Sequence, residues 1–98
     1  MQDASTKTLE PPPYARVYEQ QLATLWFDDD GMLNARAKNV PRTLEMQQEM
    51  YTFIKEISGN TRVCLLADTS TGSAQDKATR DYTAREMHTV FKAMAIIS

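Results

Sequence analysis

The chain has 98 residues and a formal net charge of −2. This length allows one domain with a single core, and the balanced charge excludes the strongly basic surface of a general nucleic-acid binder. No apolar run approaches the roughly twenty residues of a membrane-spanning helix, and the polar, proline-ended N-terminal segment is unlike a signal peptide. The single cysteine, Cys64, cannot form an internal disulfide. We therefore expect a cytoplasmic protein without a membrane span and without a nucleic-acid partner.

The first part of the chain predicts a tail followed by a β-hairpin. Residues 1–13 have no apolar periodicity and end in consecutive prolines, which favour an extended, flexible tail; one domain is expected over residues 14–98. The runs 22–27 and 32–37 flank an Asp-Gly pair, which is typical of a hairpin because glycine tolerates the positive φ of a tight turn. An earlier strand near Tyr18 is expected to run continuously into the first of these runs.

A helix is expected between Pro41 and Gly59, where apolar residues recur at helical spacing. Thr43 is the expected N-cap, and Gly59 is the expected stop, because a residue in the left-handed conformation often ends a helix. The apolar run within residues 62–68 is typical of a strand buried on both faces.

The remaining residues predict a second helix and a last strand. Residues 73–76 resemble a capping box, so the second helix is expected to start at Ser73 and to run to about His88. Residues 93–97 fit a buried strand or a continuation of the helix. We favour a strand parallel to residues 62–68, because a strand–helix–strand unit has that geometry. The order of elements predicts an α/β (α+β) fold, in which a mixed β-sheet starts with an antiparallel hairpin and helices pack on the sheet.

Several of these segments together resemble the small STAS-like bacterial domains. This SpoIIAA-like group is related to anti-sigma-factor antagonists and is grouped with Sec14-like lipid-binding folds. The resemblance extends over residues 15–98 and is carried by residues 25–33, 54–59, 63–68 and 78–82. It implies a non-enzymatic regulatory domain. Members of the group continue beyond a segment similar to residues 93–98, so we expect a domain that lacks its last elements.

The resemblance also bears on phosphorylation. In anti-sigma-factor antagonists, a Ser or Thr that receives phosphate follows an Asp at the start of the helix after the central strand. On that pattern Asp76 matches the Asp, and Lys77 stands where the acceptor hydroxyl should be. We therefore expect that this chain is not a phosphorylation switch.

The candidate site is the polar loop between the strand at residues 62–68 and the second helix. Ligands of open α/β sheets bind outside the carboxyl ends of the strands, and a helix N-terminus attracts anions. The same residues are also explained as an ordinary loop with a helix cap. The candidate ligand, anion or partner loop comprises Asp68, Thr69, Ser70, Thr71, Gly72, Ser73, Asp76 and Lys77.

No catalytic, metal-binding or cofactor-binding residues are expected elsewhere. The run Asp28–Asp30 lacks the ligand spacing and the distal Glu of a calcium loop. His88 is the only histidine, and an entire predicted helix separates it from Cys64. The bases Lys77, Arg80 and Arg85 alternate with acids, which is typical of a solvated helix face.

These observations favour a non-enzymatic regulatory or protein-interaction domain of STAS-like type. The alternative is a small-ligand or lipid-binding module of Sec14-like type, which needs an apolar pocket that we do not expect in so short a chain. The expected partner is a second copy of the chain, with another regulatory protein as a further candidate. A homodimer is expected because residues 93–97 form an apolar strand with little charge to protect its edge.

Overall fold

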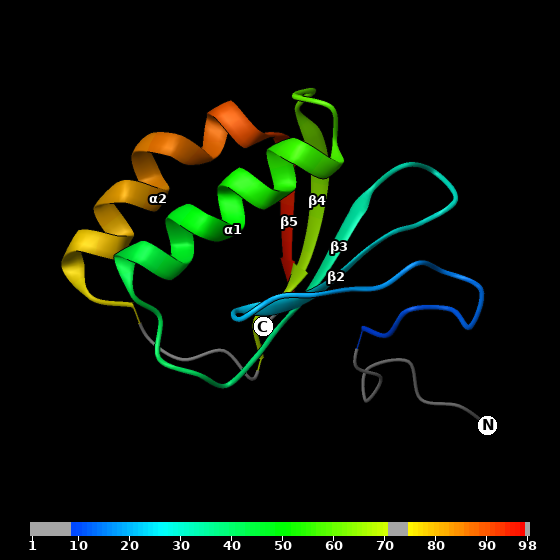
Figure 1. The fold of residues 1–98 in the computed structure, drawn as a ribbon, viewed down its shortest axis with the longest axis horizontal. Helices are drawn as coiled ribbons and strands as arrows, with labels where there is room; N and C mark the ends of the chain where they lie inside the picture. Colours follow the sequence, from blue (N-terminus) through cyan, green and yellow to red (C-terminus); the bar gives the residue numbers. More distant parts are fainter. Residues whose placement is uncertain (1–8, 71–74, 98) are drawn as a thin grey trace.

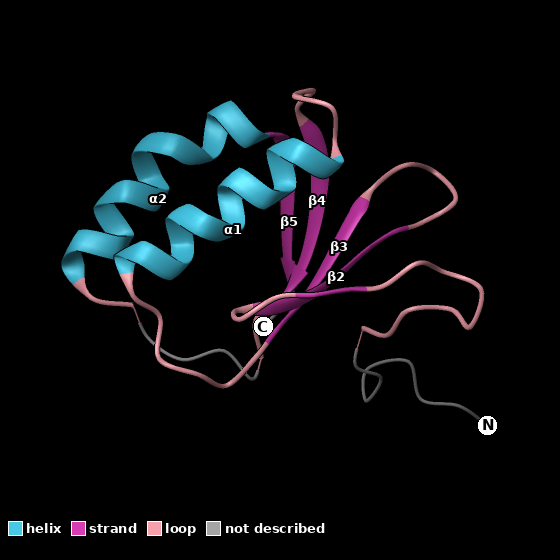
Figure 2. Ribbon diagram, in the orientation of Figure 1, coloured by secondary structure: helices cyan, strands magenta, loops and turns pink. Residues whose placement is uncertain are grey.

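The structure is a computed structural model and describes residues 9–70 and 75–97. Within these ranges the chain forms a five-stranded mixed sheet with two helices (Figures 1 and 2). This arrangement confirms the predicted fold class. The elements are β1 (Tyr18–Glu19), β2 (Ala23–Phe27), β3 (Leu33–Ala37), α1 (Leu44–Ile57), β4 (Val63–Asp68), α2 (Lys77–Val90) and β5 (Phe91–Ile97).

The strands lie in the sheet in the order in which they occur in the chain. Strands β1, β2 and β3 pair antiparallel, whereas β3, β4 and β5 pair parallel. Because the strand order never reverses, the two helical crossovers have the same sense and both helices lie on one face of the sheet (Figure 1).

The hairpin between β2 and β3 is confirmed. The Asp28 carboxylate accepts hydrogen bonds from the backbone N–H groups of Asp30 at 2.9 Å and Met32 at 3.0 Å. Gly31 has a φ of +80°, the conformation for which glycine is suited. The expected continuous first strand is wrong, because the chain turns back after Glu19 and the N–H of Gln20 donates to the carbonyl of Ala23.

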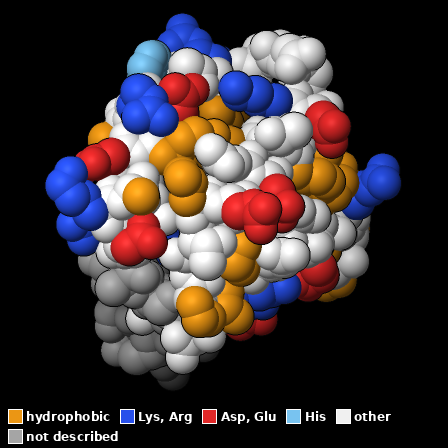
Figure 3. Space-filling model, turned by 60° about the vertical axis from the view of Figure 1, so that its left-hand side comes forward, with side chains coloured by type: hydrophobic (Ala, Val, Ile, Leu, Met, Phe, Trp, Pro, Cys, Tyr) orange, Lys and Arg blue, Asp and Glu red, His pale blue; other side chains and the backbone are white. Residues whose placement is uncertain are grey.

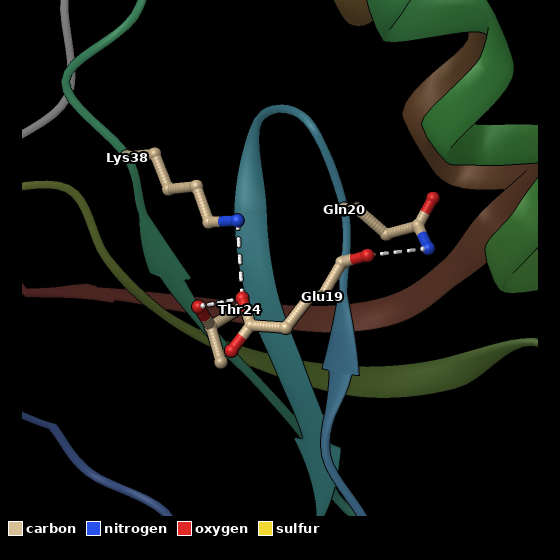
Figure 4. Close-up of polar contacts among 4 residues, drawn as sticks. All are labelled: Glu19, Gln20, Thr24 and Lys38. Carbon is tan, nitrogen blue, oxygen red and sulfur yellow. Dashed lines mark hydrogen bonds and ion pairs between the residues drawn. The ribbon is translucent and has the colours of Figure 1, made fainter.

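Polar contacts tie this edge of the sheet together (Figure 4). Glu19 Oε1 lies 3.0 Å from Lys38 Nζ and accepts a 2.9 Å hydrogen bond from the Thr24 hydroxyl. The Gln20 side-chain amide donates to the Glu19 carbonyl at 3.1 Å. The contacts with Lys38 and Thr24 lower the pKa of Glu19, which favours its charged form. The charged Glu19 side chain thus links the short strand β1 to β2 and to the residue after β3.

Helix α1 begins and ends where the sequence predicts. The Thr43 hydroxyl accepts a hydrogen bond from the N–H of Met46 at 3.1 Å, as expected of an N-cap. After Ile57, Gly59 adopts a φ of +65°, and the N–H of Asn60 donates to the carbonyl of Lys55. Local signals at both ends therefore define this helix.

Helix α2 begins later than predicted. Its N-cap is Asp76, whose carboxylate accepts a hydrogen bond from the N–H of Thr79 at 2.8 Å, and the helix spans Lys77–Val90. The predicted start at Ser73 is wrong; Ser73 itself lies outside the described residues. The physical reason is a parallel β-bridge between Gln75 and Arg42, which holds Gln75 extended and prevents the helix from starting before it.

The predicted last strand is confirmed as β5, which pairs parallel with β4 and starts directly after α2. The expectation that it is buried is wrong, because β5 lies at the edge of the sheet and its residues after Phe91 are exposed. Strand β4 is less buried than expected, because Cys64 and Leu66 on the face away from the helices are only half-buried. A segment near the N-terminus contacts that face. The N–H of Leu9 donates to the Asp68 carboxylate at 3.3 Å, and Arg36 Nη1 donates to the Leu9 carbonyl at 3.3 Å. Residues 1–8 of the expected tail lie outside the described residues.

Candidate functional site

The first residues of the predicted loop fasten the end of β4 to its neighbours. The buried Asp68 carboxylate accepts hydrogen bonds from the Ser70 hydroxyl at 2.6 Å and from the Ser70 N–H at 3.0 Å, and these bonds lower its pKa. Thr69 donates to the carbonyl of Ile97 through its N–H at 2.8 Å and through its hydroxyl at 3.2 Å. These polar groups are engaged in the turn after β4.

The other predicted loop residues do not form one cluster with them. Thr71, Gly72 and Ser73 lie outside the described residues. Asp76 caps α2, and hydrogen bonding to Thr79 lowers its pKa. The exposed Lys77 forms an ion pair with Asp81 at 2.7 Å. Among the described loop residues, Asp68 and Thr69 also reach a large cavity.

This cavity has a volume of about 590 Å³ and lies between the helices and the sheet. Its volume falls in the range of about 300–1,000 Å³ that is usual for ligand sites. The expectation that so short a chain lacks such a pocket is wrong. The cavity has space because several side chains on the helix-facing side of the sheet are small. They are Ala23, Ala35, Ala37 and Ala67.

One end of the cavity is polar. Arg42 precedes α1 and Gln75 precedes the cap of α2, and both line this end together with Gln47 and Arg80. Arg42 Nη1 donates to the Gln47 side-chain oxygen at 3.3 Å, and Gln47 is only 3% exposed. Arg80 Nη1 donates to the carbonyl of Gln75 at 3.2 Å. This end therefore presents two guanidinium groups beside the starts of both helices.

Burial perturbs two groups in the cavity wall. It lowers the pKa of Arg42, and no ion pair joins Arg42 to a carboxylate in the described part of the chain. Burial also raises the pKa of Tyr51, whose ring packs against Tyr82 and Phe91 at 5.8 and 5.7 Å between centroids. The buried hydroxyl of Thr83, which also lines the cavity, lies beside Tyr51 and lowers the pKa of that phenol. The cavity therefore combines an apolar wall with polar groups that retain binding capacity.

Catalysis by a nucleophile and a base requires the two side chains to lie close together, and the structure places the candidates His88 and Cys64 on different elements. His88 is exposed on α2, whereas Cys64 is half-buried on β4. Residues 9–70 and 75–97 contain no group of three or more His, Cys, Asp and Glu side chains suited to hold a metal ion. Neither helix in these ranges is long and apolar enough to span a membrane. The cavity is thus suited to binding, and nothing found in these ranges points to catalysis.

Charged side chains of both signs are interspersed with hydrophobic ones on the face drawn in Figure 3. Arg80 and Arg85 on α2 have acids close by. Asp76 acts electrostatically on Arg80, and Glu86 pairs with Arg85 at 3.3 Å. This mixture agrees with the predicted solvated face of α2.

Sequence reasoning did not assign Arg42, Gln47, Tyr51 or Thr83 to a site. The sequence offered one indication for Arg42. It directly precedes the N-cap of α1, as Gln75 directly precedes the N-cap of α2, so both lie beside a helix start. Pattern analysis cannot bring these two positions together, since they are separated by α1, β4 and a loop.

The fold and the cavity define a small α+β domain with a ligand-sized pocket between its helices and its sheet. The family model of a domain of unknown function, DUF7793, matches residues 25–98, and the chain belongs to this family. No curated protein and no solved structure matches the chain.

Proposed function

We propose that this protein is a non-catalytic binding domain of STAS-like type that holds a small amphipathic molecule between its helices and its sheet. The cavity of about 590 Å³ carries this proposal, because it joins an apolar wall to a polar end. Of the two functions considered from the sequence, the ligand-binding alternative therefore has the stronger physical support.

The STAS-like part of the proposal is supported by the order of the elements. An antiparallel hairpin leads into parallel strands connected by helices on one face of the sheet. A regulatory role fits a protein that binds a ligand without converting it. Lys77 occupies the first position of α2 and pairs with Asp81, which supports regulation without phosphate transfer to that position.

The test asks whether the protein carries a small molecule in its cavity. Native mass spectrometry of protein purified from a bacterial host should show the chain with an additional bound mass. Protein freed of this ligand should bind the neutral apolar dye Nile red, and the variant Ala67→Phe should lose most of this binding. Ala67 lines the cavity, so a phenyl ring there occupies part of the space.

The control variant is Ala84→Phe, which adds the same group at an exposed position of α2 outside the cavity lining. It should bind Nile red like the unmodified protein. Circular dichroism would check that both variants are folded. A protein that carries no small molecule, together with equal dye binding by both variants, would contradict the proposed function.

A further inference from the structure

The side chain of Arg42 has a charge that the described residues leave without a counter-ion. It is half-buried in the cavity wall, and its hydrogen bond goes to the neutral amide oxygen of Gln47. Desolvation lowers the pKa of Arg42, the interaction with Tyr51 raises it, and no carboxylate acts on it. A half-buried guanidinium loses part of its hydration, and an anion beside it compensates this cost.

The surroundings of Arg42 add positive potential. The bridge between Arg42 and Gln75 sets the first turns of α1 and α2 beside each other, and the N-terminal end of each helix carries a partial positive charge. Arg80, from the first turn of α2, lines the same end of the cavity, but Asp76 partly offsets its charge. The unpaired positive charge at this end is therefore mainly that of Arg42.

The nearby carboxylates are already engaged. Asp76 accepts the capping hydrogen bond from Thr79, and Asp68 accepts hydrogen bonds from Ser70 and Leu9. Both carboxylates stay charged, but Asp68 interacts electrostatically with Arg36 and Asp76 with Arg80. In the described part of the chain neither forms an ion pair with Arg42. The polar end of the cavity therefore complements a negative group.

The opposite part of the cavity complements a hydrocarbon chain. Ile54 and Phe91 are 1% and 5% exposed and line it together with Leu25 and Leu65. We infer that the ligand is an anionic amphiphile, with its charged head at Arg42 and its apolar chain against Ile54 and Phe91. This inference rests on the proposed function and specifies the chemical class of the ligand.

The experiment compares ligands that share one chain and differ in the head group. Decanoate, decyl phosphate and decanol each displace Nile red from the ligand-free protein in a competition titration. Decanoate or decyl phosphate should bind at least about tenfold more tightly than decanol, because charge-assisted hydrogen bonds are stronger than neutral ones. The tighter of the two anions identifies the head group as a carboxylate or a phosphate.

Variants assign the preference to one residue. Arg42→Gln should weaken the binding of the anions far more than that of decanol, and circular dichroism checks that the variant is folded. Arg42→Lys should keep part of the preference. Arg62→Gln removes the same charge outside the cavity lining, where Arg62 is exposed and donates to the carbonyl of His88, and should keep the full preference.

Two results would overturn the inference while leaving the proposed function intact: equal affinity for decanol and the anions, or equal effects of Arg42→Gln and Arg62→Gln. Failure of all three ligands and of Nile red to bind would instead overturn the proposed function, and the inference with it.

Discussion

Arg42 and Gln75 pair through their backbones in an isolated parallel β-bridge, although 32 positions separate them in the chain. The bridge lies directly before the N-caps of both helices, Thr43 and Asp76. It therefore fixes where α2 begins and holds the two helix starts together at the polar end of the cavity. A local pairing of two loop residues thus positions the candidate binding site.

The cap of α1 can be tested by removing its acceptor. Thr43→Ala should lower the free energy of unfolding by about 1 kcal/mol, because the N–H of Met46 loses its hydrogen-bond partner. Thr52→Ala, at an exposed position within α1, serves as the control and should change stability little. Urea unfolding followed by circular dichroism measures both. Equal stability of the two variants would argue against the cap.

Acid should destabilise the protein partly through Asp68. Hydrogen bonds from Ser70 hold the pKa of Asp68 below its ordinary value of 3.8, so the folded state favours the charged carboxylate. The stability that this provides is complete above the ordinary pKa and is lost as the pH falls through the lowered folded-state value. Asp68→Asn should therefore show a smaller acid-induced loss of stability than the unmodified protein. Urea titrations at successive pH values measure it, with the exposed Asp30→Asn as a charge-matched control.

The cavity should make one part of the core tolerant of larger side chains. Ala67→Phe places its ring where there is space, so it should cost less stability than Leu33→Phe. Leu33 is fully buried and does not line the cavity; overpacking there should cost about 1–3 kcal/mol. Thermal and urea unfolding of the two variants give the comparison. Equal destabilisation would show that the space at Ala67 is not available.

Self-association through β5 stays a prediction. In the described part of the chain β5 is an edge strand, and Met94, Ile96 and Ile97 are 39%, 54% and 42% exposed. Such an edge favours antiparallel pairing with a second copy, which would also place the two Lys92 side chains at opposite ends of the joined strands.

Sedimentation velocity at micromolar concentrations should show a dimer, and Ile96→Lys should shift it towards monomer. Val17→Lys, at an apolar position that is 38% exposed and outside β5, should leave the dimer intact. A monomer that persists as the concentration rises would exclude this pairing.

The amino-acid sequence by itself determined the local structure of this protein. The glycines at 31 and 59 adopt the positive φ angles that their turns require, and Thr43 caps α1 through its own hydroxyl. These signals act within a few residues, so they operate before any tertiary contact forms. The alternation of strand and helix patterns likewise determined the α+β class, whereas residues 93–97 fitted a strand or a helix by pattern alone.

Only the tertiary structure decided the start of α2 and the existence of the cavity. The capping signal at residues 73–76 is consistent with more than one start, and the bridge from Arg42 selects Asp76 as the cap. The cavity depends on how far the helices lie from a sheet surface that is rich in alanine. The packing of the helices on the sheet sets this distance. Sequence periodicity reports which side of an element is apolar, but it does not report how closely two apolar sides approach.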